Sequence, residues 1–142
     1  MRSKFLYNSA SEQEIHLAMT DLLRLKYKDL LWWHTPNGAS FGRDRKRAAI
    51  QGRLLKRQGM LCGVPDLFFP GLGTRGVFVE IKNAKGKLSE AQVEIMTKLT
   101  DLGYDCYMVR SCDELVKCLD NYLTEDMQLG PRTFSEVCRP TH

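Results

Sequence analysis

Three charged residues in two short stretches of the chain have the types and spacing of a hydrolytic metal site. Asp66 lies in residues 63–67 (GVPDL), and Glu80 and Lys82 lie in residues 77–82 (VFVEIK). Carboxylates hold hard divalent cations, and a bound cation activates water for attack. Two carboxylates that converge beside a lysine would therefore form a divalent-metal site with a water-activating group next to it.

The elements that must position these residues read as two short strands joined by a glycine-rich turn. Side chains two positions apart share one face of a strand, so the second strand has a core face and a face with Glu80 and Lys82. The core face consists of Val77, Val79 and Ile81, and Phe78 joins the charged face. Asp66 reaches that charged face if the two strands pair. The alternative is an exposed ion pair on a sheet, which contributes only about 0–1 kcal/mol.

The sequence around these residues resembles a nuclease family. Asp66, Glu80 and Lys82 fit the PD-(D/E)XK nuclease pattern, with Pro65-Asp66 and Glu80-Ile81-Lys82 as its two halves. The ordered set GVPDL, VEIK, GKLS (residues 86–89) and Gln92 resembles the VRR-NUC branch, the virus-type replication–repair nucleases, in a stand-alone, phage-like form. The resemblance spans roughly residues 10 to 120. It implies an α/β fold with a restriction-endonuclease-like core, in which helices flank a central mixed β-sheet.

The resemblance also implies roles for particular residues. Asp66 and Glu80 would bind Mg²⁺ or Mn²⁺ together with the main-chain carbonyl of Ile81, and Lys82 would orient the attacking water or stabilise charge on phosphorus. Gln92 would lie beside the metal-bound water or the substrate. In this superfamily a glutamate of the first helix often contributes to metal or water binding, and Glu14 stands in the matching place.

Capping offers a structural account of two of these residues. Ser11-x-x-Glu14 and Ser89-x-x-Gln92 are both capping boxes, in which the third residue of the helix bonds back to the N-cap. For Glu14 a role in capping and a role in metal binding remain equally good interpretations. For Gln92 we favour a functional role, since a cap and a second purpose can coexist.

The remaining pattern supplies the other elements of an α/β domain. The first helix has an apolar stripe, the segment 30–34 has strand character before the turn 35–38, and residues 45–58 are weakly helical. A helix starts at Ser89 and ends before Gly103, a strand covers 105–110, and a last helix follows Ser111. The stripes of the three strong helices are Ile15, Ala18, Met19, Leu22, Leu23; Ile95, Met96, Leu99, Leu102; and Leu115, Cys118, Leu119, Tyr122.

Positive charge is concentrated in one segment. Seven basic residues against Asp44 give residues 43–57 a net charge of +6, although the whole chain carries only +4. Such a cluster is typical of a polyanion partner, and the alternative is a solvated helix face. The candidate nucleic-acid contacts are Arg43, Arg45, Lys46, Arg47, Arg53, Lys56 and Arg57, with Lys85 and Lys87 in the turn after Lys82 and with Asn37 and His34 at the exit of the first strand.

Length and composition bound the remaining questions. The 142 residues suit one domain, which we place at 11–123, with a lead at 1–10, a tail at 124–142 and a basic, DNA-contacting segment at 39–59. The hydrophobic content of 43% is ordinary for a soluble protein, and neither a membrane span nor a signal peptide is evident. Five cysteines without a C-x-x-C pair favour a reducing compartment, the cytoplasm of a bacterial or phage-infected cell.

Three functions fit these observations. The first is a metal-dependent, structure-selective DNA endonuclease, in a resolvase-like homodimer that cuts branched or Holliday-junction DNA. The second is a monomeric nicking or flap nuclease. The third is a DNA-binding module that keeps the fold without catalysis, and the intact set of Asp66, Glu80 and Lys82 counts against it.

Overall fold

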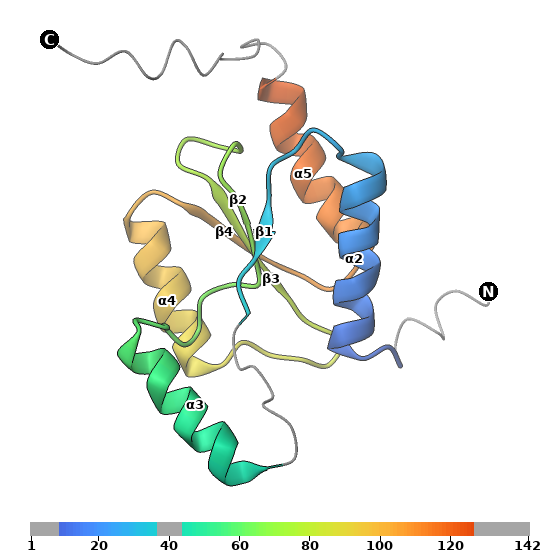
Figure 1. Cartoon of the computed structure of the whole chain (residues 1–142). Coiled ribbons are helices and arrows are strands. Elements are labelled where there is room, and N and C mark those ends of the chain that lie inside the picture. Colours follow the sequence, from blue (N-terminus) through green and yellow to red (C-terminus); the bar gives the residue numbers. More distant parts are fainter. Residues whose placement is uncertain (1–8, 37–43, 127–142) are drawn as a thin grey trace, which may run out of the picture.

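The computed structural model describes residues 9–36 and 44–126, which form a sheet with helices on both sides (Figure 1). Two of the sequence candidates, Asn37 and Arg43, lie outside these ranges, as do residues 1–8 and 127–142. In chain order the elements are α2 (Glu12–Lys26), β1 (Trp33–His34), α3 (Arg45–Arg57), β2 (Leu67–Phe69), β3 (Val77–Ile81), α4 (Glu90–Asp101), β4 (Asp105–Val109) and α5 (Cys112–Asp126). None of the helices in these ranges has the length and apolar character of a membrane span.

The sheet is mixed, as the sequence predicts. Its order is β1-β2-β3-β4, with antiparallel pairing between β1 and β2 and between β2 and β3, and parallel pairing between β3 and β4. The core-facing residues Val77, Val79 and Ile81 of β3 are fully buried with α2 and α5 residues. The opposite face of β3 lies toward α4, and Figure 1 shows the helices divided in this way between the two sides.

The helix α2 is positioned by its apolar stripe and by its cap. Ser11 and Glu14 form the predicted capping box, because Ser11 accepts from the Glu14 backbone and the Glu14 carboxylate accepts from the Ser11 backbone. Ile15, Met19 and Leu23 are buried, whereas Ala18 is exposed and Leu22 half-buried. The stripe is therefore narrower than predicted.

The two predicted strands near the site are shorter than the sequence suggests. The Leu30 backbone donates to the Tyr27 carbonyl and closes a turn after α2, so that only Trp33 and His34 pair with β2. Residues 63–66 do not form a strand either, because β2 begins at Leu67. Asp66 therefore stands just before β2, where its backbone and side chain are free to contact two neighbouring strands.

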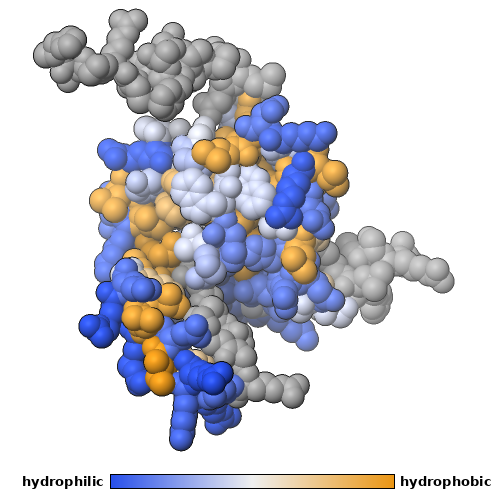
Figure 2. Space-filling model, viewed as in Figure 1, coloured by the Kyte–Doolittle hydropathy of each residue, from blue (hydrophilic) through white to orange (hydrophobic). Residues whose placement is uncertain are grey.

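The basic segment forms a complete helix rather than a weak one. The Asp44 side chain accepts from the backbones of Lys46 and Arg47 and caps α3. This helix buries none of its residues against the described part of the chain, and Ile50 and Leu54 are about half exposed. Figure 2 shows hydrophobic surface over α3 bordered by hydrophilic surface. Propensity and capping, rather than core packing, thus define α3.

The helix α4 begins at the predicted capping box of Ser89 and Gln92 and ends before Gly103, whose φ of 90° fits its predicted position after the helix. Ile95 is its one buried residue. The prediction for Leu102 is wrong, since this side chain is 63% exposed at the helix end.

Gly63 joins the segment before Asp66 to the first turn of α4. Its φ is +88°, and a Cβ added there would lie 2.6 Å from the Ala91 carbonyl carbon and 2.9 Å from the Gln92 nitrogen. Gly59 also has a positive φ, of +96°, but an added Cβ would have nothing within 4 Å. Both glycines therefore have a positive φ that disfavours other residues, but only Gly63 lies close to another backbone segment.

We expect Gly63→Ala to lower the free energy of unfolding by about 1–3 kcal/mol more than Gly59→Ala does, because only Gly63 faces a fixed backbone. Urea unfolding of the two variants and the wild type measures the difference. Equal losses for the two variants would show that the contact between Gly63 and α4 contributes nothing beyond the positive φ.

Candidate active site

Glu80 and Lys82 are buried at the carboxyl end of β3, where only 2% and 8% of their surfaces are exposed. The Lys82 ammonium lies 3.1 Å from Glu80 Oε1. The same oxygen accepts a hydrogen bond of 2.5 Å from the Gln92 side-chain amide. Each of the three side chains thus contacts a partner. The ion pair of Glu80 and Lys82 is buried, so it is not the exposed ion pair that the sequence allowed as an alternative.

Asp66 precedes β2 and contacts the ends of both β1 and β3. Its carboxylate Oδ2 accepts from the backbone N–H of Ile81, at 2.8 Å, and Ile81 lies between Glu80 and Lys82 in β3. Its main-chain carbonyl accepts from the Thr35 N–H and contacts His34 Nδ1, at 2.8 Å in both cases. A residue at the edge of β2 is therefore held by β3 on one side and by the end of β1 on the other.

The electrostatics of Glu80 fit a divalent cation. Burial, and after it the Asp66 carboxylate, raise the pKa of the Glu80 carboxyl to about 7 against the opposing effect of Lys82. A divalent charge beside a buried acid with a raised pKa offsets the cost of its ionisation and favours the ionised form of Glu80. The donor set of two carboxylates, with the Ile81 carbonyl adjacent, is one that Mg²⁺ or Mn²⁺ accepts.

The acid that α2 directs toward the site is Glu12 and not Glu14. Glu12 Oε2 lies 3.8 Å from the Lys82 ammonium, and the Glu12 charge contributes to the raised pKa of Glu80. The exposed Glu14 carboxylate accepts from both the backbone and the hydroxyl of Ser11, which lowers its pKa. Sequence reasoning missed Glu12. The signal was the spacing of four residues that aligns Glu12, His16 and the buried Thr20 on one face of α2.

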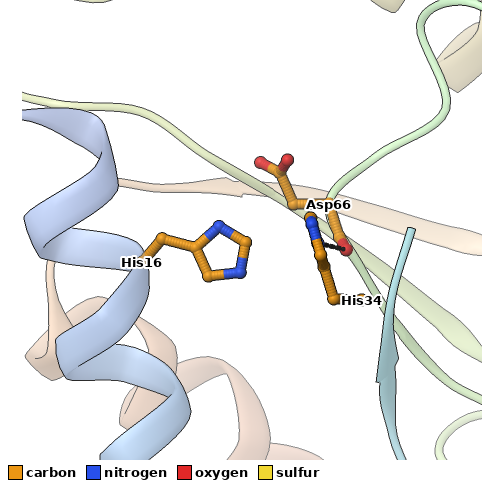
Figure 3. Close-up of side chains that lie close together, drawn as sticks. All are labelled: His16, His34 and Asp66. Carbon is orange, nitrogen blue, oxygen red and sulfur yellow. Dashed lines mark hydrogen bonds between the residues drawn. The ribbon is translucent and has the colours of Figure 1, made fainter. Parts of the chain in front are cut away.

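Sequence reasoning also missed His16, which lies with His34 and Asp66 in one cluster (Figure 3). The imidazole rings of His16 and His34 meet edge to face, with centroids 4.5 Å apart. Burial and the neighbouring His34 lower the pKa of His16, which favours its neutral form. His34 is thus brought to the site as a neighbour of Asp66, where the sequence suggested only a peripheral contact with phosphate.

Gln92 forms the predicted cap and also contacts Glu80. Its side-chain oxygen accepts from the Ser89 backbone, and its amide nitrogen donates to Glu80. The cap therefore fixes the rotamer from which Gln92 reaches the buried carboxylate. Because Gly63 packs on Ala91, the start of α4 is also held against the segment that leads to Asp66.

The basic candidates lie on two exposed segments, of which the first directly follows Lys82. Lys85 and Lys87 are exposed on the turn after Lys82, and Arg110 donates to the carbonyls of Asn83 and Gly86 in that turn. The second segment is α3, whose last residue precedes Gly63 by six positions. Its described basic residues are all exposed: Arg45, Lys46, Arg47, Arg53, Lys56 and Arg57.

Comparison with known proteins agrees with this arrangement. The family model described as the VRR-NUC domain matches residues 10–113, most of the chain. The chain belongs to the VRR-NUC domain family. A solved structure of a VRR_NUC domain protein has a TM-score of 0.63 at 22% identity, covering 82% of this chain and 90% of that one. Among curated proteins none matches.

Membership of the VRR-NUC family implies a nuclease-type function that acts on nucleic acid, and it suggests the use of a divalent metal. The fold of the solved neighbour is the fold described above, an α/β domain with a mixed sheet. In this VRR-NUC domain Glu80 and Lys82 are buried at the carboxyl end of β3, and the Asp66 carboxylate is hydrogen bonded to the Ile81 N–H between them.

The raised pKa of Glu80 predicts a pH dependence of stability in the absence of metal. An acid whose pKa is higher in the folded than in the unfolded state stabilises the fold in its protonated form. That stability is present below the ordinary value of 4.5 and is lost as the pH rises to about 7. We expect Glu80→Gln to abolish this loss, so that the variant gains on the order of 3 kcal/mol relative to wild type between pH 4.5 and 8.

Urea unfolding in EDTA over this pH range measures the effect. Glu94→Gln is the matched control, because Glu94 is exposed and its ion pair with Lys98 lowers its pKa, the opposite direction. A wild type and a Glu80→Gln variant with parallel pH profiles would contradict the assignment of the titrating group.

Proposed function

We propose that this chain is a metal-dependent, structure-selective DNA endonuclease that hydrolyses phosphodiester bonds with Mg²⁺ or Mn²⁺. The observation that carries the proposal is the buried Glu80 carboxylate, which lies 3.1 Å from Lys82 and shares its surroundings with Asp66. Burial of a carboxylate costs free energy, so its presence beside a second acid calls for a compensating cation. A module that only bound DNA would have no use for this arrangement.

Asp66, Glu80 and the Ile81 carbonyl are the groups that would hold the cation. When bound, a divalent cation supplies Lewis acidity toward the scissile phosphate and lowers the pKa of a coordinated water. Lys82 would orient the attacking water or stabilise the negative charge that develops on the phosphoryl oxygens. Gln92 positions Glu80 and offers its amide to the water or substrate. Glu12, which lies beside Lys82, takes the place that we expected of Glu14.

The proposed substrate follows from the exposed positive charge of the chain. Phosphate contacts dominate the affinity of proteins for nucleic acid, and exposed cations lie on α3 and, with Lys85 and Lys87, on the turn after Lys82. Resolution of a Holliday junction requires two symmetric cuts, which a two-fold homodimer would provide. The second candidate is a monomeric nicking or flap nuclease, and sedimentation of the protein with each DNA separates the two. We place the activity in the cytoplasm of a bacterial or phage-infected cell.

We expect cleavage of supercoiled, linear or four-way-junction DNA in Mg²⁺ or Mn²⁺ and none in EDTA. Lys82→Ala should retain DNA binding and lower the cleavage rate by about 10²–10³-fold, because it removes a charge at the reacting phosphate. Gel assays of cleavage and binding on the same substrate measure both effects.

Lys98→Ala serves as the control, because Lys98 is exposed and paired with Glu94 on α4. Lys82→Ala leaves the buried Glu80 without its ammonium partner, which costs stability. Circular dichroism therefore verifies that this variant is folded. Cutting that continues in EDTA would remove the metal mechanism, and an unchanged rate in Lys82→Ala would remove the role of this lysine.

The proposed DNA surface predicts a salt effect. Replacing Arg45, Lys46 and Arg47 by Gln should weaken binding and reduce the slope of log K against log salt by up to roughly 3, about 0.9 for each duplex phosphate that is no longer neutralised. A matched replacement of three exposed cations elsewhere, Lys26, Lys28 and Lys117 to Gln, should leave the slope nearly unchanged. Equal slopes for the α3 variant and the wild type would mean that this end of α3 does not touch phosphate.

A further inference from the structure

We propose that His16, His34 and Asp66 form a second metal position, next to the one assigned to Asp66 and Glu80, and that it takes Mn²⁺ or another first-row transition ion rather than Mg²⁺. The inference extends the proposed nuclease function, on which its catalytic meaning rests. The binding of metal itself is open to test without any cleavage.

The first step is geometric. One ring nitrogen of each histidine and one carboxylate oxygen of Asp66 all lie within 4.8 Å of one another. The three side chains come from α2, the end of β1 and the segment before β2, so the fold brings them together from distant parts of the chain (Figure 3). Ligands of one ion with bonds of 2.0–2.2 Å are separated by roughly 3–3.5 Å. A small rotation of the half-buried His16 and the exposed His34 would close that gap.

The second step concerns the orientation of the ligands. His34 Nδ1 lies 2.8 Å from the Asp66 carbonyl, and a carbonyl oxygen can only accept, so Nδ1 is the donor. In the neutral ring Nε2 then carries the lone pair. A hydrogen bond from one ring nitrogen to a backbone carbonyl is the usual support of a histidine that binds metal through the other. The Asp66 carboxylate is likewise oriented, because the Ile81 N–H holds its Oδ2.

The third step concerns the choice of ion. Two imidazoles and one carboxylate are a donor set for first-row transition ions, whereas Mg²⁺ prefers oxygen ligands throughout. Three protein ligands leave coordination positions for water or a phosphate oxygen. Asp66 would then lie between an oxygen-rich position with Glu80 and a nitrogen-rich position with the histidines. Paired ions of this kind, about 3.5–4 Å apart, stabilise both the attacking and the leaving oxygen of a phosphoryl transfer.

The test is pulsed electron paramagnetic resonance of Mn²⁺ bound to the full chain, prepared without a polyhistidine tag. We expect the wild type to show coupling of Mn²⁺ to imidazole ¹⁴N. His16→Gln and His34→Gln should each bind the nitrogen-coordinated Mn²⁺ about tenfold or more weakly, and the double variant, which lacks both imidazoles, should lose the coupling. Glu80→Gln should keep the coupling, because it alters only the oxygen-rich position. His142→Gln controls for the loss of a histidine as such.

Thermal unfolding of each variant in EDTA verifies that the protein is folded. Absence of nitrogen coupling in the wild type, or its persistence in the double variant of His16→Gln and His34→Gln, would overturn the inference. Mg²⁺-dependent cleavage in a wild type without nitrogen coupling would leave the proposed nuclease function standing. Nitrogen coupling in a protein that cuts no DNA would support the metal position and count against the nuclease.

Discussion

A carboxylate that is almost entirely removed from water is the constraint on which the rest of the site depends. Glu80 stands on the central strand β3, whose other face fills the core with Val77, Val79 and Ile81, so its position cannot shift without disturbing the core. The hydrogen bond from Gln92 and the ammonium of Lys82 partly offset the cost of burial. The Asp66 charge acts against them. The site is therefore arranged so that a further positive charge is favourable.

The positioning of Asp66 shows how irregular segments hold a precise site. Asp66 precedes β2, yet the Ile81 N–H holds its side chain while Thr35 and His34 contact its carbonyl. The tight approach of Gly63 to Ala91 fixes the segment that leads to it, and the same turn of α4 carries Gln92. Backbone contacts between the ends of the strands and the start of α4 thus fix the position of Asp66 relative to Glu80.

The sequence predicts the parts of this structure that depend on local pattern. The alternation in β3 and the capping boxes of α2 and α4 are visible in the order of residues, because side-chain period and backbone caps act over a few positions. The short β1 and the late start of β2 depend on pairing with distant segments, which no local pattern encodes. Glu12 and His16 were missed because Glu14 has its own local explanation, and only the packing of α2 shows which face meets β3.

The difference between local pattern and packing of distant segments also explains why α3 is a helix without a packing partner in the described chain. Capping by Asp44 and the propensities of its residues suffice to form it, while its basic and apolar side chains remain exposed. A helix held by local interactions can carry concentrated charge without disturbing the core, since none of the α3 residues is buried against the described part of the chain. The fold therefore separates two tasks. The central strand β3 fixes Glu80 where burial makes a cation favourable, and α3 carries exposed cations outside the core.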